Sequence, residues 1–529
     1  MKNFNIDENK IDILAFQIKE RIGKSVSVNV TQAIIESFGI RQVDVLSDYG
    51  IPTIEELAQV VHQNLEKRNH ENVLTDDNPV PKVKKITNVK NFLKDYITGI
   101  IHVFPIFFQV LSVVIFGYSL WVYADFNILQ STSVVVGVMS SLILTGGVVT
   151  VVSKQISFYW NHKNDEMVFQ TTVYLLKKGF QVLFLGNLFL IIFSVILGLF
   201  AIEMAFLSSI YSMLIGGILL FIAPLHVIKR RGIITVSIIV GTVVSLILKY
   251  YTSLSIYITH WLGISIVTLI LFLYLLRYFI KRKIVFNKFS HKEVRSEFIV
   301  YNNYIYFFYG TLFYFYIFLD RILAWSVQEK ERFLYFIFFE KDYEIGIDIA
   351  LLTYLLVAGI MEFSISSFTT VLDDMQSQIK ATETQNYGRL FLKKYFRNVL
   401  LLTLSCCLAF SIQAFLMYSP HGYNSFFDED LNDLNIKVCI LGSLGYFFLS
   451  WAALNVLYFF TLGQPLKAFN GLLIAILCNV SVGLFLSRLM SYELSVIGFL
   501  FGSFVFMLYT TYHLRGFFKK MDYYYYAAF

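Results

Sequence analysis

Charged side chains are scarce in this chain of 529 residues, where Asp, Glu, Lys and Arg together make up 15%. A soluble globular protein carries about 25%, so the chain has too few ionic groups to cover a water-exposed surface. Its 7 Pro, 29 Gly and 4 Cys exclude a collagen, a Pro/Gly-rich disordered chain and a disulfide-built secreted module. Hydrophobic residues make up 57%, including 53 Phe and 34 Tyr. This composition indicates a polytopic integral membrane protein.

Catalytic and cofactor-binding motifs are also missing from the sequence. It contains no P-loop, no G-x-S-x-G, no H-E-x-x-H and no dinucleotide fingerprint after a strand. We therefore expect neither an enzyme nor an ATP-driven pump, and no cofactor or metal. The four cysteines lack metal-ligand spacing and are interpreted as small core residues; they are Cys406, Cys407, Cys439 and Cys478. The net charge of +6 resides mostly in short loops, so no nucleic-acid partner is expected.

The first 67 residues differ from the rest because charges return and apolar residues recur at helical spacing, as in Ile11, Leu14 and Ile18. The stretch 53–56 (Thr-Ile-Glu-Glu) is typical of a capping box that starts a helix. Residues 68–95 are polar and contain two prolines, which is typical of a linker. The sequence thus predicts a small helical cytoplasmic module at 1–67, a linker at 68–95 and a membrane domain from residue 96.

Apolar runs follow one another from about residue 96 onward. Crossing about 30 Å of hydrocarbon takes about 20 helical residues, and these runs are too long and too continuous for barrel strands. The sequence therefore predicts twelve membrane-spanning helices, at 97–123, 130–152, 172–200, 206–228, 232–249, 255–280, 299–325, 347–371, 395–419, 436–460, 468–487 and 493–514.

The basic residues gather in alternate loops, which fixes the expected orientation. They are Lys154, Lys163, Lys229, Arg230, Arg231, Lys281, Arg282, Lys283, Lys288, Lys292, Arg295, Lys393, Lys394, Arg397, Arg515, Lys519 and Lys520. The opposite loops are short or acidic, as in 427–430. Because positive loops stay inside, we expect a multi-pass protein of the cytoplasmic (inner) membrane with both termini in the cytoplasm and 420–435 outside.

The longest basic loop falls after the sixth predicted span. We therefore expect an all-α membrane domain of two six-helix bundles, at 96–283 and 299–529 (the latter including a cytoplasmic tail), joined by a cytoplasmic loop at 284–298. Many secondary transporters consist of two such halves with the substrate path between them. The two halves show no clear sequence repeat.

Ionisable residues inside membrane spans are expensive to bury and are the default functional candidates. The strongest are Asp320 and Arg321, adjacent near the outer end of the seventh predicted span. On a helix they point about 100° apart, so they do not share one partner easily. They either line a hydrated substrate path or reach the outer interface by snorkelling.

Glu362 lies deeper in the eighth predicted span, and counting residues makes a direct Arg321–Glu362 pair improbable. It is interpreted either as a hydrogen-bonded structural glutamate or as part of the path. Weaker candidates are Lys177, Lys178 and Lys249, for which anchoring at the membrane rim is the competing explanation.

Three stretches resemble known transporters. Residues 145–157 (TGGVVTVVSKQIS) resemble the segment with which flippases of the multidrug/oligosaccharidyl-lipid/polysaccharide (MOP) superfamily enter their first cytoplasmic loop. Residues 315–325 and 455–460 (NVLYFF) are similar to the seventh and tenth helices of PelG-like transporters of Pel exopolysaccharide systems, and 523–529 to their aromatic C-terminal end. The chain departs from that family in its N-terminal module and in lacking an acidic residue after Tyr458 and Phe459.

The resemblance, which covers about residues 97–529, implies exopolysaccharide export of the kind used in biofilms. A polysaccharide or lipid-linked glycan would cross between the halves by flippase-like alternating access. Expected partners are a cytosolic glycosyltransferase, membrane subunits of an export complex and the lipid bilayer. Two alternatives stay open: a cation-coupled small-molecule antiporter of the multidrug type, with Asp320 or Glu362 as the coupling carboxylate, and a non-transporting scaffold of a polysaccharide synthase.

Overall fold

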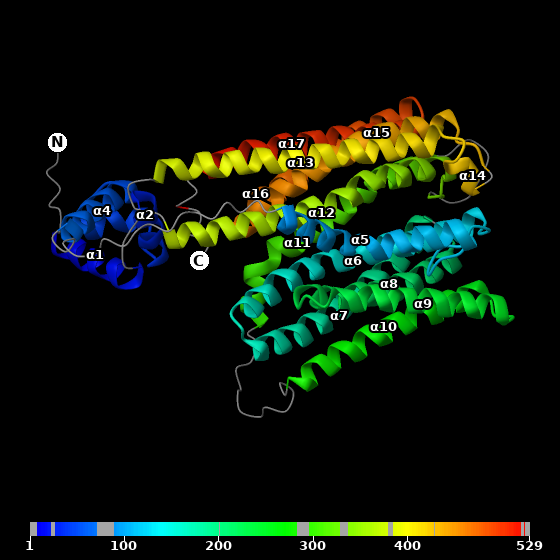
Figure 1. The fold of residues 1–529 in the computed structure, drawn as a ribbon, viewed down its shortest axis with the longest axis horizontal. Coiled ribbons are helices and arrows are strands. Elements are labelled where there is room, and N and C mark those ends of the chain that lie inside the picture. Colours follow the sequence, from blue (N-terminus) through cyan, green and yellow to red (C-terminus); the bar gives the residue numbers. More distant parts are fainter. Residues whose placement is uncertain are drawn as a thin grey trace.

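The computed structural model describes residues 8–22, 27–70, 89–199, 201–282, 296–327, 337–378, 384–427, 429–519 and 523. Its regular structure over these residues is helical, apart from an isolated bridge between Tyr118 and Tyr123. Figure 1 shows a small helical body beside a larger bundle of long helices. The all-α class predicted from the hydrophobic runs is confirmed.

The N-terminal body consists of four helices, α1 (Glu8–Ile22), α2 (Val28–Ser37), α3 (Gln42–Tyr49) and α4 (Ile54–His70). The apolar positions at helical spacing form its own core, in which Ile18, Ile35 and Leu57 are fully buried. The Thr53 hydroxyl accepts a hydrogen bond from the Glu56 amide at 3.2 Å, the cap interaction that starts α4. We call these four helices the N-terminal module.

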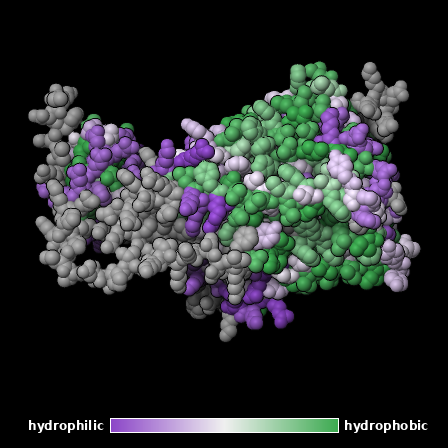
Figure 2. Space-filling view, turned by 45° about the horizontal axis from the view of Figure 1, so that its top comes forward, coloured by the Kyte–Doolittle hydropathy of each residue, from purple (hydrophilic) through white to green (hydrophobic). Residues whose placement is uncertain are grey.

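Twelve long helices and one short helix form the bundle. They are α5 (Val89–Phe116), α6 (Ile128–Asn161), α7 (Asp165–Leu197), α8 (Ile202–Val227), α9 (Arg231–Tyr251), α10 (Ile256–Lys281), α11 (Ser296–Trp325), α12 (Lys341–Gln378), α13 (Thr384–Tyr418), α14 (Tyr423–Phe427), α15 (Asp433–Thr461), α16 (Pro465–Leu489) and α17 (Ser495–Lys519). Within the described residues, eleven are long and apolar enough to cross a membrane, and α5 contributes a shorter apolar stretch, Phe104–Phe116. Figure 2 shows apolar side chains along the bundle and hydrophilic ones towards its ends.

Several predicted helix boundaries were wrong. The first span was predicted to reach residue 123, but α5 ends at Phe116, where Gly117 adopts a positive φ of 61° and turns the chain. In the other direction, α6 extends nine residues past the predicted end at 152, and α12 begins at Lys341 rather than 347. Hydropathy detects the part of a helix inside hydrocarbon, whereas these helices continue into water with polar residues.

The same helix pairings occur twice along the chain, once in α5–α10 and once in α11–α17. In the first set α6 packs on α7 and α8, and α9 packs on α10; in the second, α12 packs on α13 and α15, and α16 packs on α17. The buried apolar residues of the bundle also form two main clusters that follow this division. We refer to α5–α10 as the first half and α11–α17 as the second half.

The two halves touch along two helix crossings, α6 on α11 and α5 on α12. Both crossings use glycine. A Cβ atom on Gly310 of α11 would lie 2.5 Å from the Gly146 carbonyl oxygen of α6, and one on Gly99 of α5 would lie 2.5 Å from the Gly359 Cα of α12. Small residues allow such close backbone approach in membrane helices. The residues at these two crossings are therefore constrained by size.

We predict that Gly310→Ala lowers the free energy of unfolding by about 1–3 kcal/mol, the usual cost of forcing extra atoms into a packed contact. Gly516→Ala is the control, because Gly516 lies in α17 and a Cβ there has no neighbour within 4 Å. Thermal unfolding of the purified proteins in detergent measures both. Equal stability of the two variants would contradict the crossing geometry.

Candidate functional site

Arg321 lies near the end of α11 with its side chain only 6% exposed. One guanidinium nitrogen donates to Glu344 of α12, and the other donates to Asp348, one turn further along α12, at 2.8 Å. The fork of the guanidinium thus spans two carboxylates on one face of α12, a geometry that a lysine ammonium does not reproduce.

Asp320, the residue next to Arg321, is also buried, and it accepts a hydrogen bond from the Tyr343 hydroxyl at 2.6 Å. Adjacent residues of α11 therefore bind adjacent residues of α12. We call Asp320, Arg321, Tyr343, Glu344 and Asp348 the α11–α12 charge cluster. Its two buried carboxylates, Asp320 and Glu344, thus have a tyrosine hydroxyl and a guanidinium as their respective hydrogen-bond donors.

The charge cluster matches neither predicted environment of Arg321. Sequence reasoning offered a snorkelling cation at the outer interface or a cation in an open hydrated path, but the side chain is enclosed between two helices of the second half. Glu344, Asp348 and Tyr343 were missed, because the predicted span began at 347 and left Tyr343 and Glu344 in a loop. The acidic residues at 342, 344 and 348 were the available signal.

Glu362 of α12 pairs with Arg231 at the start of α9, with an N–O distance of 2.9 Å. The structure does not pair it with Arg321, as the residue count indicated. This ion pair gives Glu362 a charged hydrogen-bond partner and joins the second half to the first. Arg231 was used in the sequence only to orient the loops, so its partner was not anticipated.

Further polar contacts join α6 to α11 near the same end of the bundle. The Lys154 ammonium donates to the Asn302 carbonyl oxygen at 3.1 Å and lies 3.8 Å from the centroid of the Tyr306 ring. One helical position away, the Asn303 amide donates to Gln155 at 3.1 Å. We call these contacts, together with Arg231–Glu362, the inter-half clamp.

The weaker lysine candidates lie in the first half, away from the charge cluster. Lys177 and Lys178 are exposed on α7. Lys249 lies over the rings of Tyr118, Tyr123 and Tyr250, with centroid distances of 4.9, 4.5 and 5.3 Å. These cation–π contacts fit the predicted anchoring of Lys249 at a helix end.

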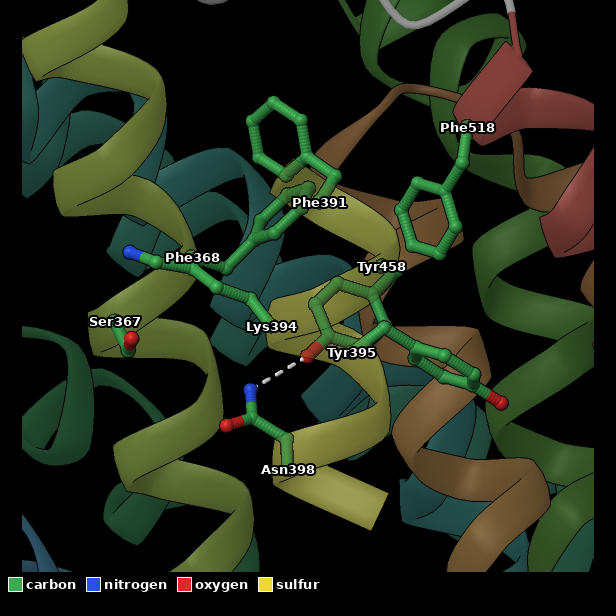
Figure 3. A pocket seen from close by; sticks show the side chains of 8 residues that line it. All are labelled: Ser367, Phe368, Phe391, Lys394, Tyr395, Asn398, Tyr458 and Phe518. Atoms are coloured by element: carbon green, nitrogen blue, oxygen red, sulfur yellow. Dashed lines mark hydrogen bonds between the residues drawn. The ribbon is translucent and has the colours of Figure 1, made fainter. Parts of the chain in front are cut away.

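A small pocket in the second half is lined by one residue of the tenth-helix motif, Tyr458 (Figure 3). The Tyr458 hydroxyl accepts from the Asn398 amide at 2.9 Å, and Asn455, three residues earlier, accepts from the Tyr395 hydroxyl at 2.9 Å. Both motif residues are buried and tie α15 to α13. Their visible role is therefore to hold the second half together.

We predict that removing one partner of the Arg321–Glu344 pair destabilises the protein by about 3–5 kcal/mol, because the other charge stays buried without compensation. Arg321→Leu and Glu344→Leu should each show this loss, and the double variant should lose less than the sum of the two. Chemical unfolding in detergent measures all three proteins.

The control for this cycle is Lys341→Ala, which breaks the exposed Lys341–Glu429 pair beside the cluster. Exposed pairs contribute about 0–1 kcal/mol, so this variant should remain close to the unsubstituted protein. Strictly additive losses for Arg321→Leu and Glu344→Leu would show that the buried pair is not an energetic unit.

Solved structures of membrane transporters have a similar fold. The chain is similar to a mutant of the Vibrio cholerae MATE transporter VcmN (TM-score 0.57, 12% identity, covering 81% of this chain and 97% of that one). It is also similar to a MATE protein in its bent conformation (TM-score 0.55, 13% identity, 82% and 97% covered). A third similar structure is the outward-facing form of a multidrug resistance MATE family transporter of the MOP superfamily (TM-score 0.52, 11% identity, 81% and 96% covered).

No protein-family model matches the sequence, and a search of curated proteins found no match. Sequence identities of 11–13% support a shared fold but do not identify the substrate. This chain has the all-α fold of MATE transporters of the MOP superfamily.

Proposed function

We propose that this protein exports a polysaccharide, or its lipid-linked precursor, across the cytoplasmic membrane by alternating access between its two halves. The transporter fold supports movement of a substrate across a membrane. The observation that carries the mechanism is the inter-half clamp, a small set of polar contacts that joins two separately packed halves near one end.

The strengths of the clamp contacts suit a gate that opens and closes. The Arg231 and Glu362 side chains are 18% and 34% exposed, so water competes for both groups. A cation–π contact such as Lys154 over Tyr306 contributes about 0.5–1 kcal/mol at an exposed site. Breaking a few such contacts costs several kcal/mol, which is the energy gap typical of proteins that switch between two states.

Charge around the clamp supports a neutral or anionic substrate. The clamp contains Lys154 and Arg231 against the single carboxylate of Glu362. The two fully buried carboxylates of the charge cluster, Asp320 and Glu344, already have a hydroxyl and a guanidinium partner. Amide and tyrosine side chains complete the clamp, and such groups bind sugar hydroxyls and ring faces. The PelG-like resemblance points to the same substrate class.

A cation-coupled multidrug-type antiporter is the second candidate, and one observation favours it. Asp320 is a buried carboxylate that accepts a hydrogen bond from the Tyr343 hydroxyl, and buried carboxylates are the groups that carry protons in coupled transporters. The similar structure from a multidrug resistance transporter agrees with this candidate as well as with export. The third candidate, a scaffold of a polysaccharide synthase, would not need the clamp to open.

The N-terminal module is proposed to bind a cytosolic glycosyltransferase. Its core is complete, yet four large apolar side chains remain 44–72% exposed on α1 and α3, namely Ile13, Phe16, Val43 and Leu46. Exposed apolar residues grouped on one small body are typical of a protein-binding surface. Additional membrane subunits of an export complex are proposed on the resemblance alone.

We predict that Arg231→Glu and Glu362→Arg each lower polysaccharide export at least fivefold per folded molecule, because like charges then face each other across the halves. The combined exchange should restore much of the loss, since it re-forms the pair with reversed sign. Arg282→Glu is the control, because Arg282 pairs with Asp165 inside the first half. Normal export from both single variants would show that the Arg231–Glu362 pair is not needed for export.

The substrate class is tested with the purified protein in liposomes. Export of a polysaccharide or lipid-linked glycan without drug-dependent proton flux is the expected result. Proton flux that depends on a cationic drug, and that Asp320→Asn abolishes, would replace the export proposal with the antiporter. Loss of polysaccharide synthesis in membranes lacking the protein, rather than loss of export, would indicate the scaffold.

Removal of residues 1–75 should leave membrane insertion intact, because the module has its own core and the first membrane helix follows it. Export should fall, since the docking site for the synthesising enzyme is lost. The amount of protein in the membrane fraction is measured beside export. Insertion with unchanged export would disprove the docking role.

A further inference from the structure

A lateral groove runs between α7 of the first half and α11 of the second half, with α6 as its floor. It encloses about 500 Å³, within the 300–1,000 Å³ typical of small-molecule sites. Its floor is formed by the buried Val148 and Val151, and its rim includes the exposed Lys178, Val300 and Tyr304. The groove lies apart from the charge cluster and uses neither charged residue of the Arg231–Glu362 pair.

Three helices place this groove at one level of the membrane. For each helix we take the rise of 1.5 Å per residue from the end remote from the cytosol to the groove residue. This rise is about 28 Å to Lys178 of α7, about 30 Å to Val148 of α6 and about 32 Å to Tyr304 of α11. All three residues therefore lie at a similar depth, in the cytoplasmic halves of their helices and about one hydrocarbon thickness (about 30 Å) from the opposite helix ends.

The polar lining residues lie in the middle and at the cytosolic end of the groove. Val182 and Phe307 line the part towards the hydrocarbon, and Lys178 and Asn303 lie in the middle. Glu297 lies at the cytosolic end, beside the apolar Ile299 and Val300. Among the described residues, Lys178 has no carboxylate within salt-bridge distance. Asn303 is 2% exposed, and its Oδ1 atom has no hydrogen-bond partner among those residues. An apolar groove with a free cation and an unsatisfied amide oxygen in its middle matches an acyl chain whose polar head group lies at these two groups.

The wall formed by α7 is available to lipid. Only 17% of its membrane-spanning window is buried, the smallest share among the candidate spans. Long apolar side chains such as Phe184 and Leu185 are about 60% exposed along it. In a bilayer these surfaces contact acyl chains, so a lipid enters the groove by sideways diffusion.

We propose that this groove binds one anionic phospholipid, with an acyl chain between α7 and α11 and its phosphate at Lys178. The Asn303 Oδ1 atom accepts from a hydroxyl of the head group, and Glu297 at the cytosolic end disfavours a second phosphate there. Because the walls belong to different halves, the bound lipid contacts both. Its affinity therefore depends on the arrangement of the halves, so the lipid favours one of them. This binding does not depend on which substrate the protein transports.

The neighbouring lysine provides a matched control. Lys177 and Lys178 have the same charge, the same helix and nearly the same depth, but only Lys178 lines the groove. General attraction of anionic lipids is worth about 1 kcal/mol per lysine near the surface, and it acts on both residues alike. A difference between Lys177→Gln and Lys178→Gln therefore reports the groove itself.

The test is titration of the full-length protein in detergent with phosphatidylglycerol, counting bound lipids by native mass spectrometry. We expect one tight site that Lys178→Gln weakens at least tenfold, the factor that corresponds to a lost hydrogen bond between charged groups. Lys177→Gln should weaken binding by no more than about fivefold, the factor of the general attraction alone. Phosphatidylcholine, which has no net charge, should bind more weakly than phosphatidylglycerol.

A second pair of variants tests whether the lipid occupies the groove. Val300→Trp fills the groove from an exposed position and should abolish the tight site, whereas Val173→Trp adds the same ring to α7 outside the groove and should not. Equal weakening by both lysine variants, equal binding of the two lipids, or unchanged binding by Val300→Trp would each overturn the proposal. None of these measurements uses export, so they fail or succeed independently of the proposed function.

Discussion

Close contact between glycine backbones determines how the two halves of this protein meet. At Gly146–Gly310 and Gly99–Gly359 the helices approach so closely that a single added Cβ atom overlaps backbone. Packing of this kind contributes van der Waals contact without charge or directional bonds. The energy difference between one arrangement of the halves and another is therefore set by the few polar groups beside the crossings. These are the groups of the inter-half clamp.

The charge cluster and the clamp each contain a buried or partly buried arginine, but the two arginines have different roles. Arg321 is enclosed inside the second half and spans two carboxylates, so breaking it costs as much as a large core substitution. Arg231 pairs with Glu362 between the halves, where partial exposure makes the pair weaker and exchangeable. A transporter needs both: halves that stay intact and a contact between them that opens.

Sequence reasoning recovered the class of fold and most helices, because long apolar runs follow directly from the thickness of the bilayer. It also singled out Asp320, Arg321 and Glu362 as unusual, but not their partners. Tyr343 and Glu344 fell outside the predicted span, and the Glu362–Arg231 contact joins helices that are 131 residues apart. The repeated pairing of helices was invisible for a similar reason: it is conserved in packing geometry, while the residues that pack differ between the halves.

The central claim is that the halves separate at the clamp, and a distance measurement between them tests it most directly. Spin labels at Phe158→Cys of α6 and Phe298→Cys of α11, both exposed near the clamp, report the opening in a background free of other cysteines. The account predicts two distance populations, with the longer one enriched by Arg231→Glu, and a single unchanged population for a Phe158→Cys and Lys229→Cys pair inside the first half. One short distance in every variant would contradict it.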